Sequence, residues 1–96
     1  MAGPELVLPA TVLTAHLESC AAELAADPAP PDDLAQVVGQ LVSGQRHIAA
    51  TLERLARQQG STPVADRAAL AAVLRAAARA TGHAADALAE VEHLFE

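Results

Sequence analysis

Proline divides this chain into three stretches that can each form a long helix. The prolines stand near the N-terminus, within residues 28–31, and at position 63. Proline has no backbone N–H and restricts the residue before it, so a helix does not continue through these positions. Between them, alanine, leucine, arginine, glutamate and glutamine dominate, and these residues favour helix. We therefore predict an all-α protein with helices over about residues 9–26, 31–59 and 63–95.

The second predicted helix has a start signal and a stop signal. Pro31 suits its first position, and Asp32 and Asp33 would then occupy the first turn, where carboxylates favour the positive end of the helix dipole. Gly60 is expected to end it.

The third predicted helix is marked in the same way. Ser61 or Thr62 can cap it, Pro63 suits its start, and Asp66 falls in its first turn. Gly82 lies far inside this helix and could bend or break it, which leaves a four-helix alternative open.

Apolar residues repeat along each predicted helix with the 3.5-residue period of coiled-coil packing. In the second helix the predicted seam is Leu34, Val38, Leu41, Gln45, Ile48, Leu52, Leu55 and Gln59. In the third it is Leu70, Leu74, Ala77, Thr81, Ala84, Leu88, Val91 and Phe95, and the first helix adds Leu13, Leu17, Cys20 and Leu24. Because the connections are short, we predict a single domain, residues 1–96, folded as an up-down-up three-helix bundle with a long antiparallel hairpin of the second and third helices.

The three helices differ in length. At 1.5 Å per residue the first helix is about 27 Å long and the others exceed about 40 Å. The first helix is expected to lie against residues 32–48 and beside residues 74–90, which leaves the hairpin tip uncovered. The tip's apolar residues are Ile48, Leu52, Leu55, Leu70, Val73 and Leu74. We predict a homodimer in which two tips form a four-helix bundle. The alternative is that the first helix docks differently and the tip frays.

Charge is distributed unevenly along the chain. Residues 1–45 carry six acidic residues and no arginine, residues 46–79 carry a net +4, and residues 80–96 carry −4. The basic segment contains every cation of the chain: Arg46, Arg54, Arg57, Arg67, Arg75 and Arg79. In the folded hairpin these segments form a basic tip and an acidic base, although the net charge of the chain is −6.

The basic tip has several interpretations. It could bind an acidic protein, a phosphate backbone or an anionic lipid surface, or two bipolar chains could pack head to tail. The favoured interpretation is that these arginines are solvated on outward positions, with an i,i+4 pair between Glu53 and Arg57. Sequence-specific binding of nucleic acid is disfavoured, because no helix-turn-helix pattern and no lysine-rich arm is present.

Four residues could in principle hold a zinc ion: His16, Cys20, His83 and Asp86. His16 and Cys20 are four residues apart on the first helix, and a parallel arrangement of the first and third helices would bring them level with the other two. The favoured interpretation is instead that Cys20 is buried in the core as a small hydrophobe. We therefore predict no metal site and no cofactor.

The composition excludes several kinds of chemistry. The chain has no lysine, no tryptophan and no tyrosine, and Phe95 is its one aromatic residue. Schiff-base catalysis and the P-loop require lysine, and stacking on single-stranded nucleic acid requires aromatic residues. No nucleophile triad and no glycine-rich phosphate loop is present, and thin alanine-faced helices leave little room for a pocket. We predict that the protein is not an enzyme.

These observations lead to one preferred function and two alternatives. We expect a small, self-associating helical module that binds an unidentified protein partner. A domain that senses a ligand or metal, and a nucleic-acid-associated regulator using the arginine tip, are the alternatives. Since the N-terminus has no basic leader segment and no apolar run spans a bilayer, we expect a cytoplasmic protein that does not insert into membranes.

Overall fold

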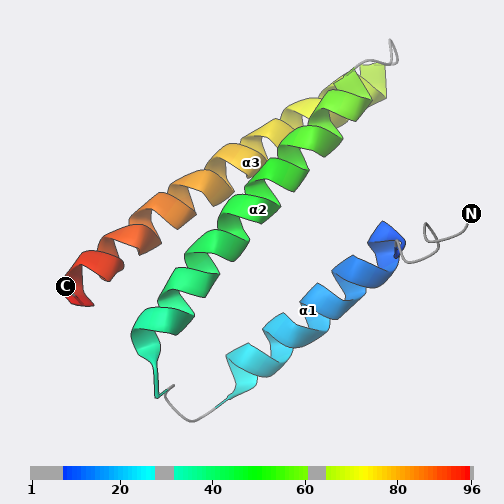
Figure 1. Cartoon of the computed structure of the whole chain (residues 1–96). Helices are drawn as coiled ribbons and strands as arrows, with labels where there is room; N and C mark the ends of the chain where they lie inside the picture. Colours follow the sequence, from blue (N-terminus) through cyan, green and yellow to red (C-terminus); the bar gives the residue numbers. More distant parts are fainter. Residues whose placement is uncertain (1–7, 28–31, 61–64, 96) are drawn as a thin grey trace, which may run out of the picture. The chain divides into compact units, whose positions relative to one another are not determined.

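The computed structural model describes residues 8–27, 32–60 and 65–95, and all regular structure in these ranges is helical. Three α-helices follow in chain order, α1 (Ala10–Ala26), α2 (Leu34–Gly60) and α3 (Ala65–Glu92), with a short 3-10 helix η2 (His93–Phe95) at the end (Figure 1). The chain divides into two compact units, Met1–Pro30 and Pro31–Glu96, and each is described by itself. The all-α prediction is therefore confirmed, and the single domain stays a prediction.

Helix α1 begins one residue later than predicted. Pro9 is the residue before the helix, with extended backbone angles, rather than its first residue. Its carbonyl oxygen accepts hydrogen bonds from the N–H groups of Val12 and Leu13, at 3.1 and 3.2 Å. At the other end Asp27 is extended again, as expected of a residue that precedes a proline.

Helix α2 begins at Leu34, so the prediction that Asp32 and Asp33 occupy its first turn is wrong. Asp33 instead caps the helix: its Oδ1 accepts the N–H of Gln36 at 3.2 Å, and its backbone oxygen accepts the N–H of Val37 at 3.1 Å. An aspartate in this position satisfies backbone donors that have no partner within the helix. Pro31 lies outside the described residues. The helix ends at Gly60, as predicted.

Helix α3 runs through Gly82 without interruption, so a break into a fourth helix does not occur there. A methyl group added at Gly82 would meet no heavy atom within 4 Å. Asp66 lies in the first turn, as predicted, whereas Ser61, Thr62 and Pro63 lie outside the described residues. The regular α-helix ends at Glu92, three residues before the predicted end, and the chain tightens into η2.

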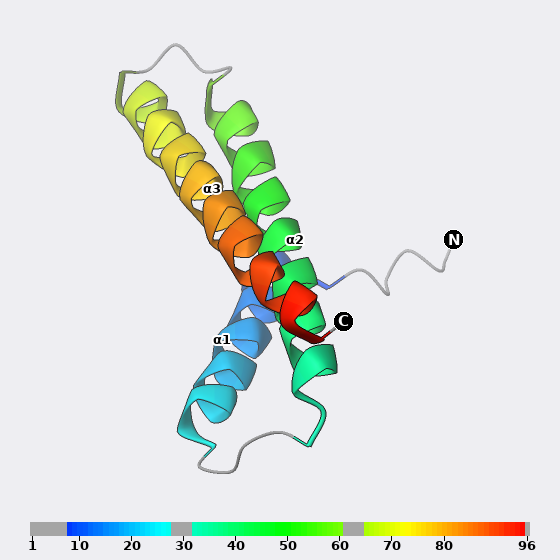
Figure 2. The same ribbon diagram turned by 90° about the vertical axis from the view of Figure 1, so that its left-hand side faces the viewer.

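Helices α2 and α3 pack against each other as an antiparallel hairpin, and both views show them side by side (Figures 1 and 2). Two ion pairs cross between them. Arg46 Nη1 is 2.9 Å from Asp86 Oδ1, and Arg75 Nε is 3.9 Å from Glu53 Oε1. Their four side chains are about half exposed, so each pair contributes only about 0–1 kcal/mol. The pairs show how the two helices are aligned, whereas apolar packing supplies most of the stability of the hairpin.

The packing between α2 and α3 is formed largely by small residues, which we call the inner seam. On α2 the inner seam consists of Val38, Val42, Gln45, Ala49, Leu52, Ala56 and Gln59. On α3 it consists of Ala71, Leu74, Ala78, Thr81, Ala85 and Leu88. Its buried members are two valines and four alanines, and Ala56 and Ala85 are completely inaccessible. Such small side chains let two helices approach closely.

The inner seam corrects half of the predicted seams. Eight predicted residues lie beside the most buried row: Leu34, Leu41, Ile48, Leu70 and Ala84 are exposed, and Leu55, Ala77 and Val91 are half-buried at its edge. Six of the eight are replaced by the alanine or valine that follows them, and the exceptions are Leu34 and Val91, which are followed by exposed Ala35 and Glu92. The predicted seams and the inner seam repeat with the same period, but the inner seam has smaller side chains and so allows the two helix backbones to come closer. The larger aliphatic side chains are consequently left outside the hairpin's own packing.

Candidate interaction surface

A second apolar row runs along each helix of the hairpin, one position before the inner-seam residues, and we call it the outer seam. Leu34, Val91 and Leu94 continue its heptad spacing beyond the inner seam. On α2 it consists of Leu34, Val37, Leu41, Gly44, Ile48, Thr51, Leu55 and Gln58. On α3 it consists of Leu70, Val73, Ala77, Ala80, Ala84, Ala87 and Val91, and Leu94 of η2 continues it. One residue turns a helix by about 100°. Since α2 and α3 are antiparallel, this rotation places both rows on the same side of the hairpin.

The outer seam is apolar and exposed. None of its residues is charged, and six of its large aliphatic side chains have exposed fractions of 36% to 80%: Leu34, Leu41, Ile48, Leu70, Val73 and Leu94. A side chain of this kind stabilises a protein by about 1.5–3 kcal/mol when it is fully buried. Contiguous exposed rows of this length are characteristic of surfaces that bind another protein.

The opposite side of the hairpin is polar. Both cross-helix ion pairs lie there, because Arg46, Glu53, Arg75 and Asp86 each follow an inner-seam residue by one position. The same rotation that places the outer seam on one side places these residues on the other. The hairpin therefore has one uncharged side and one charged side.

The predicted apolar tip residues divide between the two seams. Leu52 and Leu74 belong to the inner seam and are half-buried. Ile48, Leu55, Leu70 and Val73 belong to the outer seam. The sequence reasoning missed that this exposed row is not confined to the tip, since it continues to Leu34 on α2 and Leu94 at the other end. A search for a second heptad repeat, one residue out of step with the first, could have found it.

The six arginines divide into two groups. Arg46 and Arg75 form ion pairs, and Arg67 Nη1 donates a hydrogen bond to Gln59 Oε1. Arg54, Arg57 and Arg79 are exposed and form no ion pair within the described part of the chain. The predicted pair between Glu53 and Arg57 is wrong, because Glu53 faces Arg75 across the hairpin. Half of the predicted basic tip thus serves contacts within the hairpin.

The candidate metal ligands lie on different units. His16 Nε2 and Cys20 Sγ are 3.6 Å apart on α1, whereas His83 and Asp86 belong to α3. Asp86 is the ion-pair partner of Arg46. In residues 8–27, 32–60 and 65–95, no three His, Cys, Asp or Glu side chains are grouped closely enough to hold a metal ion. The expectation that Cys20 is buried is wrong: the residue is exposed.

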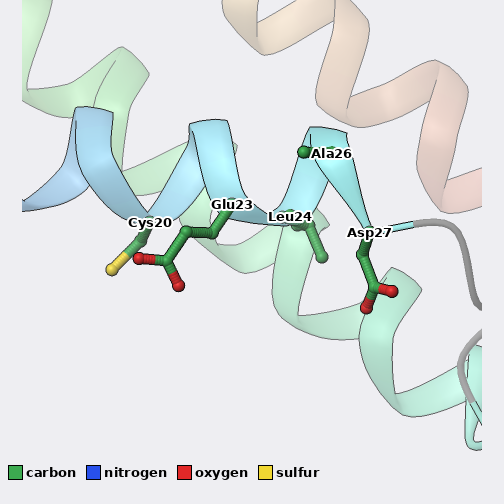
Figure 3. A pocket seen from close by; sticks show the side chains of 5 residues that line it. All are labelled: Cys20, Glu23, Leu24, Ala26 and Asp27. Atoms are coloured by element: carbon green, nitrogen blue, oxygen red, sulfur yellow. The ribbon is translucent and has the colours of Figure 1, made fainter.

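A shallow hollow lies beside the last turns of α1 (Figure 3). Its lining residues are Cys20, Glu23, Leu24, Ala26 and Asp27. All five come from α1 and the residue after it, and the side chains of Cys20 and Glu23 extend from the same side of the helix (Figure 3). One side of a single helix does not enclose a small molecule in the way ligand pockets do.

Gln45 is a polar residue within the inner seam, and its Oε1 atom is buried without a hydrogen-bond partner. An antiparallel hairpin centred on residue 61, as the predicted helix boundaries imply, would set Gln45 near Ala77. The ion pairs correct this register, since residue 46 meets residue 86 and residue 53 meets residue 75. Gln45 therefore lies at the level of residues 83–87. A buried amide oxygen that makes no hydrogen bond costs about 1–3 kcal/mol.

Replacing Gln45 with leucine is expected to stabilise the hairpin by about 1 kcal/mol, because the unpaired oxygen is removed and the seam stays filled. Urea denaturation followed by circular dichroism measures the change. Gln40→Leu is the matched control, since Gln40 is exposed on the same helix and its replacement should change stability by less than about 0.5 kcal/mol. A loss of stability in Gln45→Leu would show that the amide has a partner in solution. A changed oligomeric state in light scattering would show that Gln45 determines how the helices align.

Comparisons of the chain with protein-family models, with curated proteins and with solved structures find no match. Within the described ranges, no helix is both long enough and apolar enough to span a bilayer. The features that bear on function are those of the hairpin itself: an uncharged outer seam, a charged opposite side and three exposed arginines near the tip.

Proposed function

We propose that this protein is a small, non-catalytic helical module that acts through protein–protein contact and associates with itself. The observation that carries the proposal is the outer seam, an uncharged heptad row on both helices of the hairpin with large aliphatic side chains exposed. Heptad rows of this kind are the contact surfaces of coiled coils and helical bundles.

The lengths of the helices support self-association. The outer seam of α2 extends from residue 34 to residue 58, a distance of about 36 Å. Helix α1 has 17 residues and is about 25 Å long. A single helix of that length is too short to cover the row, whereas a second hairpin matches its length. The up-down-up arrangement of the three helices and its completion by dimerisation both belong to this proposal.

The arginines favour a protein partner over nucleic acid. Affinity for nucleic acid comes mainly from cations that neutralise phosphates, and three of the six arginines are already used within the hairpin. Arg57 and Arg79 each follow an inner-seam residue and so lie on the charged side. Together with exposed Arg54 they could meet an acidic protein surface.

Size-exclusion chromatography with light scattering tests the proposal directly. We expect a mass of twice 9.8 kDa at micromolar concentration. In hydrogen exchange, the amides of α2 and α3 should gain protection as the protein concentration rises through the dissociation constant. A monomer at all accessible concentrations would contradict self-association.

A further inference from the structure

The outer seam of α3 reads the same in both directions. In chain order its residues are leucine, valine, four alanines, valine and leucine, from Leu70 to Leu94. The midpoint of this row is Gly82, and residues at equal distances on either side are of the same type. A two-fold antiparallel contact centred on this level sets residues at equal distances from it against each other. In this row each side chain would therefore meet one of its own type and size.

The midpoint of the outer seam of α2 lies close to this level of the hairpin. That row runs from residue 34 to residue 58 and is centred on Arg46. Glu53 is seven residues after Arg46, Arg75 is seven residues before Gly82, and these two residues form an ion pair across the hairpin. Because the helices are antiparallel, this pair sets Arg46 level with Gly82, whereas the pair of Arg46 with Asp86 sets it level with residue 86. The two midpoints therefore lie within about one helical turn of each other along the hairpin, and one two-fold axis can pass close to both.

We infer that the outer seam binds a second copy of this chain with the two hairpin tips at opposite ends. This inference rests on the proposed self-association and specifies its geometry. Helix α3 lies antiparallel on α3 of the partner, and α2 lies antiparallel on α2 of the partner. The two-fold axis crosses the interface close to the levels of Arg46 and Gly82.

Side-chain sizes are complementary in this arrangement. On α3, leucine meets leucine, valine meets valine and alanine meets alanine, so the helices approach closely near the axis and bury larger side chains toward the ends. On α2, Ile48 is set opposite Gly44 and Leu41 opposite Thr51. A large residue facing a small one packs without a void.

The charge distribution favours the same orientation. The tip segment, residues 46–79, carries +4, and the base of the hairpin carries Asp32, Asp33, Asp86, Glu90 and Glu92. With the tips at opposite ends, the basic tip of each copy lies alongside the acidic base of the other. Two hairpins joined tip to tip would place the arginines of both copies together.

Disulfide trapping tests the orientation. In a Cys20→Ser background, the double variant Val73→Cys/Val91→Cys places the two thiols opposite each other across the α3 contact. Within one helix they are 18 residues apart, about 27 Å, too far for an intramolecular bond. We expect mild oxidation to give a covalent dimer that reductant reverses, with residue 73 joined to residue 91 in the peptide map. Light scattering before oxidation reports whether the variant self-associates.

The single variants and an off-seam pair are the controls. In the inferred dimer each residue is about 27 Å from its own copy, so Val73→Cys alone and Val91→Cys alone should give no covalent dimer. Ala72→Cys/Glu90→Cys has the same spacing off the outer seam and should also give none. Dimers that form as readily from the single variants, or from the off-seam pair, would overturn the orientation but not self-association. A monomer in light scattering would overturn the proposed function itself.

A distance measurement gives an independent test that leaves the seam intact. Arg57 is exposed and lies eleven residues from the level of the axis. Nitroxide labels on Arg57→Cys in the Cys20→Ser background should be separated by about 33 Å or more between the two copies. A dimer with its tips together would give a much shorter distance and would overturn the inference.

Discussion

Replacing Ile48 with glutamate is expected to convert the proposed dimer into a monomer while the hairpin remains folded. Ile48 lies near the middle of the outer seam, and 36% of it is exposed in the single chain, so a glutamate there can reach water. In the dimer the same carboxylate would be buried without a partner. An uncompensated buried charge costs about 3–5 kcal/mol, which raises the dissociation constant by at least about 100-fold.

The matched control is Ala50→Glu, which introduces the same charge at an exposed position of α2 off both seams. We expect this variant to remain dimeric. Light scattering measures the mass of each variant, and circular dichroism verifies that the helix content of each is unchanged. If both variants stayed dimeric with equal dissociation constants, the contact surface would lie elsewhere on the molecule.

Replacing Ala85 with leucine is expected to destabilise the hairpin by about 3 kcal/mol. Ala85 is completely inaccessible in the inner seam, so the added atoms must force α2 and α3 apart. Overpacking of this kind typically costs about 1–3 kcal/mol, and a contact between alanines has little free space. For a chain of this size the midpoint of thermal unfolding should fall by more than about 10 °C.

Ala76→Leu is the control for this change, because Ala76 is exposed on the same helix and lies on neither seam. Its effect should stay within about 0.5 kcal/mol. Thermal and urea unfolding are measured for both variants at one protein concentration, so that dimerisation affects them equally. Equal stability of the two variants would mean that α3 packs on α2 through the outer seam instead.

The helices themselves were predictable because their signals are local. Proline and glycine predicted the helix boundaries to within about three residues. Asp33 was expected in the first turn of α2, but because the helix starts later, Asp33 caps it instead. The continuity of α3 through Gly82 was not predictable from the residue alone. Glycine weakens a helix by about 1 kcal/mol, and the long alanine-rich flanks outweigh that cost.

The candidate surface was predicted only in part. The sequence indicated that Ile48, Leu55 and Leu70 would lack cover, and they lie on the outer seam. Its extension along the whole hairpin was missed, because Leu34 and Leu41 were assigned to the contact between α2 and α3. Leu52 and Leu74 were placed on the surface but contribute to the hairpin's own packing.

The sequence by itself determined that this chain forms three helices and that α2 and α3 each have an apolar arc with a heptad period. That arc is wide enough for two seams, and period alone does not say which of them faces the neighbouring helix. Only the tertiary structure decided this, because the choice depends on how closely two backbones approach, and that distance depends on both helices together. The alanines of the inner seam, such as Ala56 and Ala85, allow the closer approach. Large aliphatic residues of the outer seam, such as Leu41 and Ile48, are left exposed.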